Sequence, residues 1–274
     1  MPVFLSLLVL LSALVSVLGP AQASCTGLAK GASATVARVL DAGTLVLHDG
    51  SELRLAGVLT PHADDARAAP KAWAPAVAAK AEVEALVLGK SISIAFGSER
   101  RDRYGRHLGH AFLGDGVERR WLQGHLLAQG LARVVTRAED RACEIEMLAA
   151  ERPAREARRG LWAEAAYGIR QAADLDSLSA LTGSFQIVEG RIASRRRSGA
   201  GLRLEFGKEG RFGLVALLPR AGRGAGRDLD KSPRVRLRGW LEERGGRPTL
   251  DLTAIGTLEV LEEGIGDSGA MGYR

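Results

Sequence analysis

The chain has 274 residues, of which 46% are hydrophobic and 26% are charged. This composition excludes an intrinsically disordered protein and suits one or two globular domains with cores of their own. Lys and Arg number 38 against 32 Asp and Glu, which gives a formal net charge of +6. Such an excess is compatible with a polyanionic partner but is too small to require one.

The first 23 residues have the features of an export signal. Residues 3–18 are apolar or small, and Ala21-Gln22-Ala23 follows with the small-x-small pattern that signal peptidase accepts. The apolar run is shorter than the roughly 20 residues that a bilayer span needs. The sequence therefore predicts a signal peptide over residues 1–23, no permanent membrane span after its removal, and a periplasmic or extracellular protein.

Elements with alternating and then helical periodicity follow the signal. Alternation at period two predicts strands over residues 34–40, 44–48 and 53–57, with Asp49-Gly50 as a hairpin turn between the last two. Apolar residues at helical spacing predict a helix over residues 72–88. The remaining elements expected in this half are strands over 91–96 and 107–113 and helices over 121–130 and 143–159.

Two arginine-bearing motifs stand out within these elements. One reads Arg-Leu-Ala-Gly-Val-Leu-Thr-Pro over residues 54–61, and the other reads Asp-Arg-Tyr-Gly-Arg over residues 102–106. A turn upstream of both reads Asp-Ala-Gly-Thr over residues 41–44. In this order, from about residue 34 to residue 162, the chain resembles the staphylococcal nuclease (thermonuclease) family. The resemblance implies an α+β fold, an oligonucleotide-binding-type five-stranded barrel with helices, in an enzyme that cuts DNA and RNA with calcium, two arginines and a glutamate.

The resemblance assigns roles to particular residues. Arg54 and Arg106 stand at the two family arginine positions, where a planar guanidinium can pair with two phosphate oxygens. Tyr104 lies beside them in the second motif as a nucleic-acid contact. The family's acidic residues are absent, since Gly43 and a leucine replace two metal ligands and His62 replaces the presumed general base. The leucine is Leu59, and neither it nor Gly43 offers an atom that ligates calcium.

Two interpretations of this substituted site remain open. The first has no metal and no cofactor, and its arginines bind an anion without cutting it. In the second, calcium is held by rebuilt ligation from Asp64 and Asp65, or His62 acts as a general base without metal. An imidazole with a pKa near 6.5 suits the second role at neutral pH.

The two cysteines, Cys25 and Cys143, predict a disulfide, because an even number of cysteines in an exported protein favours pairing. The sequence holds no Cys-x-x-Cys motif and no local cluster of Cys and His. That absence argues against a zinc site or a redox centre.

A second module follows the first. We expect the thermonuclease-like domain over residues 31–165, a linker over 166–182, a smaller all-β domain over 183–263 and a flexible tail over 264–274. The all-β domain looks like the small oligonucleotide-binding-fold barrels appended to exported thermonuclease-like proteins, and Arg195 and Arg196 are its candidate nucleic-acid contacts. Its expected strands cover residues 185–192, 202–206, 212–218, 235–242 and 249–261.

Three functions from different classes fit these observations. The first is an exported, catalytically degenerate protein that binds DNA, RNA or another polyanion. The second is an active phosphodiester-cleaving nuclease. The third is a scaffold that binds another protein of the cell envelope, because a fold alone does not decide function.

Overall fold

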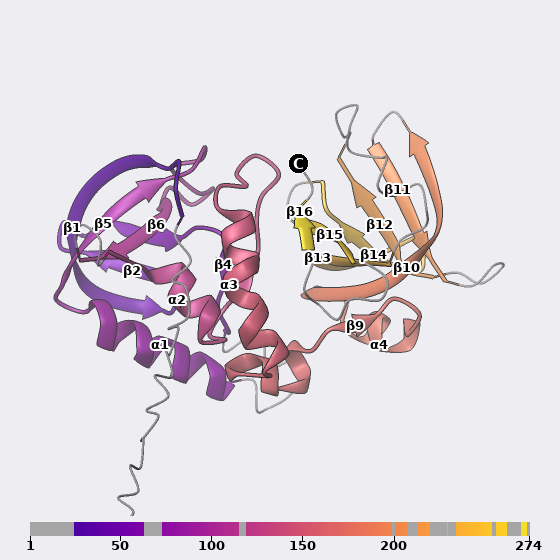
Figure 1. Cartoon of the computed structure of the whole chain (residues 1–274), viewed down its shortest axis with the longest axis horizontal. Coiled ribbons are helices and arrows are strands. Elements are labelled where there is room, and N and C mark those ends of the chain that lie inside the picture. Colours follow the sequence, from indigo (N-terminus) through magenta and orange to yellow (C-terminus); the bar gives the residue numbers. More distant parts are fainter. Residues whose placement is uncertain are drawn as a thin grey trace, which may run out of the picture.

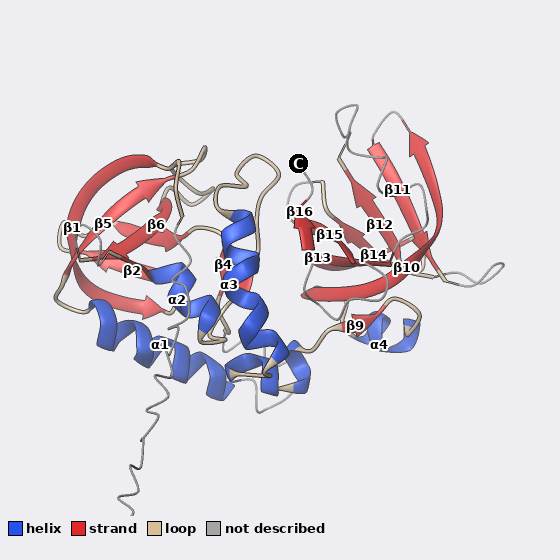
Figure 2. Ribbon diagram, in the orientation of Figure 1, coloured by secondary structure: helices blue, strands red, loops and turns tan. Residues whose placement is uncertain are grey.

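The computed structural model describes residues 25–62, 73–114, 119–198, 201–207, 213–219, 229, 234–253, 256–261 and 270–272. The expected signal peptide lies outside these residues. Two closed five-stranded barrels follow one another along the chain (Figure 1). Most helical residues belong to the first barrel, whereas the second is built mainly of strands (Figure 2). The predicted fold class is therefore confirmed.

The first barrel forms from the strands that the alternating pattern predicted. Its strand order is β3-β2-β1-β5-β6, and parallel pairing of β3 with β6 closes it. Asp49 and Gly50 make the expected turn, in which Gly50 has a φ of 82° and the Ser51 N–H donates to Asp49 Oδ1 at 2.9 Å. The strands are β1 (Ala29–Asp41), β2 (Thr44–Leu47), β3 (Glu52–Leu55), β5 (Ser91–Phe96) and β6 (His107–Leu113), with β7 (Arg120–Trp121) paired to β6.

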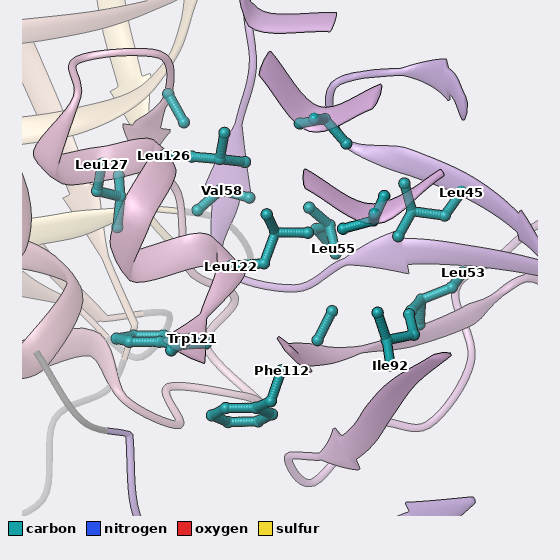
Figure 3. Packing of buried hydrophobic residues seen from close by; sticks show 14 of the residues in the cluster. Leu45, Leu53, Leu55, Val58, Ile92, Phe112, Trp121, Leu122, Leu126 and Leu127 are labelled. Carbon is teal, nitrogen blue, oxygen red and sulfur yellow. The ribbon is translucent and has the colours of Figure 1, made fainter. Parts of the chain in front are cut away.

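Helices cover this barrel because their apolar faces meet its interior. In Figure 3, Leu122 of α2 lies against Leu55, and Leu126 lies beside Val58. All four side chains are buried in one cluster, so barrel and helix share a core. The helices are α1 (Trp73–Val87), α2 (Leu122–Ala128) and α3 (Glu144–Glu156), and a short ribbon pairs β4 (Val58–Leu59) with β8 (Arg133–Val134).

The second barrel has the order β10-β11-β12-β14-β13 and closes through pairing of β13 with β10. The strand expected over residues 249–261 is divided in two, because a turn follows Asp251. Trp240 is 42% exposed and meets Phe185 edge-on, so its ring lies at the surface of this barrel. The strands are β10 (Ser184–Ser198), β11 (Gly201–Phe206), β12 (Val215–Leu218), β13 (Arg234–Arg244), β14 (Arg247–Asp251) and β15 (Thr257–Leu261).

Two segments expected to lack structure contain regular elements. The expected linker includes β9 (Arg170–Gln171), which pairs with β10, and α4 (Leu175–Ala180). Leu178 of α4 is fully buried in the core of the second barrel, and this burial outweighs the polar composition that predicted a linker. Within the expected tail, β16 (Ala270–Gly272) pairs with β15. Two short 3-10 helices, η4 (Gly160–Ala163) and η5 (Ala165–Tyr167), precede β9.

A buried ion-pair network joins the two barrels. Arg238 on β13 is fully buried and donates from Nη1 and Nη2 to both carboxylate oxygens of Glu151 on α3, at 2.9 and 2.8 Å. Its Nε donates to Glu259 on β15 at 2.9 Å. Glu151 also accepts from Arg155 and from the Val134 N–H, each at 2.7 Å. α3 lies between the barrels (Figure 1), so a helix of the first domain is fixed to a strand of the second.

We expect Arg238→Leu to destabilise the protein by about 3–5 kcal/mol, because removal of one partner leaves the Glu151 carboxylate buried without its bidentate cation. The matched control is Arg244→Leu. The Arg244 side chain is 47% exposed and bridges Glu242 and Asp251, so its loss should cost only about 0–1 kcal/mol. Denaturant-induced unfolding of both variants measures the difference. If both substitutions lowered the free energy of unfolding equally, the buried network would not be what holds the barrels together.

Candidate nucleic-acid interface

Pairing of β3 with β6 brings the two predicted arginines into one region. Arg54 lies opposite Leu108 in the parallel register, and Arg106 precedes Leu108 by two residues. The pKa of Arg54 is lowered mainly by burial, and the negative charge of Asp41 opposes this effect. The positive charge of Arg106 lowers the pKa of Arg54 further. The two guanidinium groups therefore act on each other electrostatically.

Arg54 is held by the turn that the sequence singled out. Its Nη1 donates to Asp41 Oδ1 at 3.2 Å and to Thr44 Oγ1 at 3.0 Å. The Gly43 N–H donates to the same Asp41 oxygen at 2.7 Å. A Cβ atom on Gly43 would lie 2.6 Å from Arg54 Nη1 and 3.1 Å from Thr60 Oγ1. The guanidinium thus fills the space that a side chain at position 43 would need.

The residues at the family's metal positions do not fit calcium. That ion takes six to eight oxygen ligands, whereas Gly43 and Leu59 supply no side-chain oxygen. The neighbouring carboxylate of Asp41 is already paired with Arg54. A fixed guanidinium among these groups would also repel a second cation.

His62 is exposed and lies at the end of the described segment 25–62. Asp64 and Asp65, which the sequence offered as substitute ligands, lie outside the described residues.

A single carboxylate organises the loop that carries Arg106. Asp102 Oδ2 accepts from Arg106 Nε at 2.7 Å, and Oδ1 accepts from the N–H groups of Tyr104 and Arg106 at 2.9 and 3.0 Å. Gly105 has a φ of 81°, and its N–H closes the turn onto the Asp102 carbonyl at 3.0 Å. Burial raises the pKa of Asp102, but hydrogen bonds from Arg106 and Tyr104 outweigh it and hold the pKa below the ordinary value.

Tyr104 is the most exposed large hydrophobic side chain among the described residues. It is 69% exposed, and the guanidinium carbons of Arg103 and Arg106 lie 5.0 and 5.3 Å from its ring centre. An open groove of about 510 Å³ runs beside it, lined also by Arg101, His107 and Glu52. An aromatic face flanked by cations is thereby presented to solvent.

A narrower cavity of about 160 Å³ lies behind Arg54 and is lined by His110, Thr136 and Asp140. His110 is 1% exposed, and its Nδ1 has no hydrogen-bond partner among the described residues. Burial lowers the pKa of His110 to about 4 against the opposing charge of Asp140, so the ring is neutral at neutral pH. The sequence did not single out His110, because a histidine inside an apolar strand carries no local signal.

The cysteines form the predicted disulfide, with a Cα–Cα distance of 5.4 Å between Cys25 and Cys143. One ring nitrogen of His110 and the two sulfur atoms all lie within 4.8 Å of one another. The fold thus places a histidine beside the disulfide, although the three residues are far apart along the chain.

The candidate contacts of the second module lie in a different domain from Arg54 and Arg106. Arg195 and Arg196 are exposed on β10, and Arg196 stands opposite Arg203 of β11 in the antiparallel register. They form a separate basic surface on the β10–β11 hairpin.

The barrel, its covering helices and its two arginines define an oligonucleotide-binding-type fold of the nuclease-like class. A profile of the family described as staphylococcal nuclease homologue matches residues 52–164. The match covers most of the first barrel and its helices, so this part of the chain is a staphylococcal nuclease-like domain. No curated protein matches the chain significantly. Within the described residues, no helix combines the length and apolar character needed to cross a bilayer.

The depressed pKa of Asp102 gives a pH prediction. A carboxylate whose folded pKa lies below its unfolded value of about 3.9 stabilises the fold fully above that pH. The stabilisation is lost as the pH falls through the folded pKa. We expect Asp102→Asn to melt below the wild type at neutral pH and the difference to shrink in acid. Melting curves of both proteins at a series of pH values test this, and a difference that stays constant with pH would contradict it.

Proposed function

We propose that this is an exported, catalytically degenerate nuclease-like protein that binds single-stranded nucleic acid through Arg54, Arg106 and Tyr104. The observation that carries the proposal is the position of Arg54. Its guanidinium occupies the space beside Gly43 in which the family resemblance implies a carboxylate and a metal ion. The site thus keeps a fixed arginine cation and lacks the carboxylate that would help to hold a metal ion.

Both arginines have donors to offer a phosphate. A guanidinium carries five N–H donors. Asp41 and Thr44 engage Nη1 of Arg54, and Asp102 engages Nε and Nη2 of Arg106. These partners orient each guanidinium and leave further N–H groups on it for a ligand. Charge-assisted hydrogen bonds of this kind are stronger than neutral ones and suit phosphate geometry.

Tyr104 supports single-stranded nucleic acid as the ligand. Bases without a pairing partner stack on exposed aromatic rings, and each such stack contributes about 1–3 kcal/mol. The groove beside Tyr104 is open and is bordered by Arg101 and Arg106, so a strand could place a base on the ring and its phosphates on the guanidinium groups.

The substitutions disfavour cleavage. Metal ions polarise the phosphate and activate water, and a general base removes the proton of that water. The donor set around Arg54 does not fit calcium, and position 62 carries a histidine in place of the family glutamate. Export is consistent with the disulfide and with the apolar N-terminal run.

The second barrel is a further candidate surface for the same polyanion. Arg196 and Arg203 face each other across two strands, and two like charges so placed repel unless an anion lies between them or near them. Arg203 also donates to Glu205 at 3.1 Å, which offsets part of this repulsion.

We expect Arg54→Ala and Arg106→Ala each to weaken binding of a short fluorescent single-stranded oligonucleotide by about 1–3 kcal/mol at low salt. Lys80→Ala removes the same charge from the exposed face of α1 and should leave affinity unchanged. Fluorescence anisotropy over a series of salt concentrations measures both affinity and the number of phosphate contacts.

Unchanged affinity in a folded Arg54→Ala, Arg106→Ala double variant would contradict the proposal. If Arg195→Ala, Arg196→Ala instead abolished binding, recognition would lie in the second barrel. If no oligonucleotide bound at all, the protein-binding scaffold would become the better explanation.

We expect the wild type to show no calcium-dependent cleavage of DNA or RNA. Restoring the acidic residues in Gly43→Asp, Leu59→Asp, His62→Glu should create calcium binding measurable by calorimetry, with at least some chelator-sensitive cleavage. Leu59→Asp, His62→Glu is the matched control, because it leaves Arg54 undisturbed and lacks the carboxylate at position 43. Chelator-sensitive cleavage by pure wild type that disappears in Arg106→Ala would establish an active nuclease instead.

A further inference from the structure

The groove beside Tyr104 is lined by one acidic side chain, Glu52, which has no role in the function proposed above. Glu52, Arg101, Tyr104 and Arg106 all line this open groove of about 510 Å³. Within the part of the chain that the structure describes, the half-buried Glu52 carboxylate forms no hydrogen bond or ion pair. Glu52 thus stands in the groove as an acceptor without a donor.

The two arginines that line the groove are held by other acceptors. Arg101 Nη1 donates to the Gly105 carbonyl at 2.6 Å, and Arg106 Nη2 lies 2.7 Å from Asp102 Oδ2. These partners draw both guanidinium groups away from Glu52. Its carboxylate can therefore accept hydrogen bonds from a ligand that enters the groove.

Glu52 lies on the same face of β3 as Arg54. Side chains two residues apart on a strand point the same way, and about 6.5–7 Å of strand separates them. Both residues are half-buried, whereas Leu53 between them is fully buried in the barrel core. A phosphate on Arg54 therefore brings the adjoining nucleotide close to Glu52, in the groove that also presents the ring of Tyr104.

A carboxylate in this position distinguishes bases by the hydrogen bonds that they can donate. It only accepts hydrogen bonds, and its charge repels phosphates. Thymine has a single N–H between two carbonyl oxygens, and adenine and cytosine each have an amino group beside a ring acceptor. Guanine alone presents a ring N–H and an amino group side by side, and two parallel N–H donors match the two oxygens of a carboxylate. As a purine, guanine also offers a large surface for stacking on an aromatic ring.

We propose that Glu52 makes this groove selective for guanine in a single strand, an inference that rests on the nucleic-acid-binding function proposed above. The guanine stacks on Tyr104 and donates two hydrogen bonds to the Glu52 carboxylate, while the adjoining phosphates lie on Arg54 and Arg106. A strand without guanine meets the same negative charge and has no donor pair to offset it. The carboxylate thus acts against the wrong base as well as for the right one.

The test compares two fluorescent pentanucleotides by anisotropy at low salt, one of thymidine only and one with a single central guanine. A good bidentate contact discriminates between bases by about tenfold, so we expect the wild type to bind the guanine pentamer about tenfold more tightly. Glu52→Ala should remove this preference, because it weakens the guanine pentamer and strengthens the all-thymidine one. Glu156→Ala removes the same charge from an exposed position at the end of α3 and should change neither affinity.

Circular dichroism of both variants establishes that each one folds. Equal affinity of the wild type for the two pentamers would overturn the guanine selectivity and leave the nucleic-acid-binding function intact. A preference that persisted in Glu52→Ala would also overturn it, because stacking on Tyr104 would then select the purine without the carboxylate. If neither pentamer bound, both proposals would fail.

A uridine pentamer with ribose or with deoxyribose tests the rival ligand group. We expect the wild type to bind the two equally. Tighter binding of the ribose form that is lost in Glu52→Ala would assign the carboxylate to the 2′-hydroxyl and overturn its assignment to guanine.

Discussion

The salt bridge between Arg238 and Glu151 is the interaction on which the arrangement of the molecule depends. Both side chains are fully buried, and they come from different barrels. Removing a charge from water costs several kcal/mol, which only a well-placed partner offsets. Here the pair is bidentate, and Glu259, Arg155 and the Val134 N–H complete it. The bidentate pair has one partner in each domain, so one buried network contains charges from both barrels.

In the candidate interface, too, carboxylates pair with partly buried arginines and fix their positions. Asp41 fixes Arg54, and Asp102 fixes Arg106 together with the backbone of its turn. Each guanidinium is only partly exposed, so its orientation is set before a ligand arrives, which reduces the entropy cost of binding. Gly43 is part of this arrangement, because a larger residue there would displace Arg54. The glycine at position 43 and the position of the Arg54 guanidinium are therefore sterically coupled.

Helix α3 connects the remaining features. It carries Glu151 toward the second barrel, and the disulfide from Cys143, the residue before the helix, ties its N-terminal end to the segment before β1. His110 lies beside that disulfide and at the end of the cavity that reaches Arg54.

The sequence by itself determined the local structure and the choice of candidate site residues. Period-two alternation, the Asp49-Gly50 turn and the two arginine motifs are local signals, and they predicted both the first barrel and the residues to examine in it. Contacts between distant residues needed the tertiary structure. Arg238 and Glu151 are 87 residues apart, and neither a charged residue in a strand nor one in a helix indicates burial. For the same reason, the sequence did not indicate that His110 lies beside the cysteines or that α4 packs into the second core. Which groups are buried depends on partners that come together only when the chain folds.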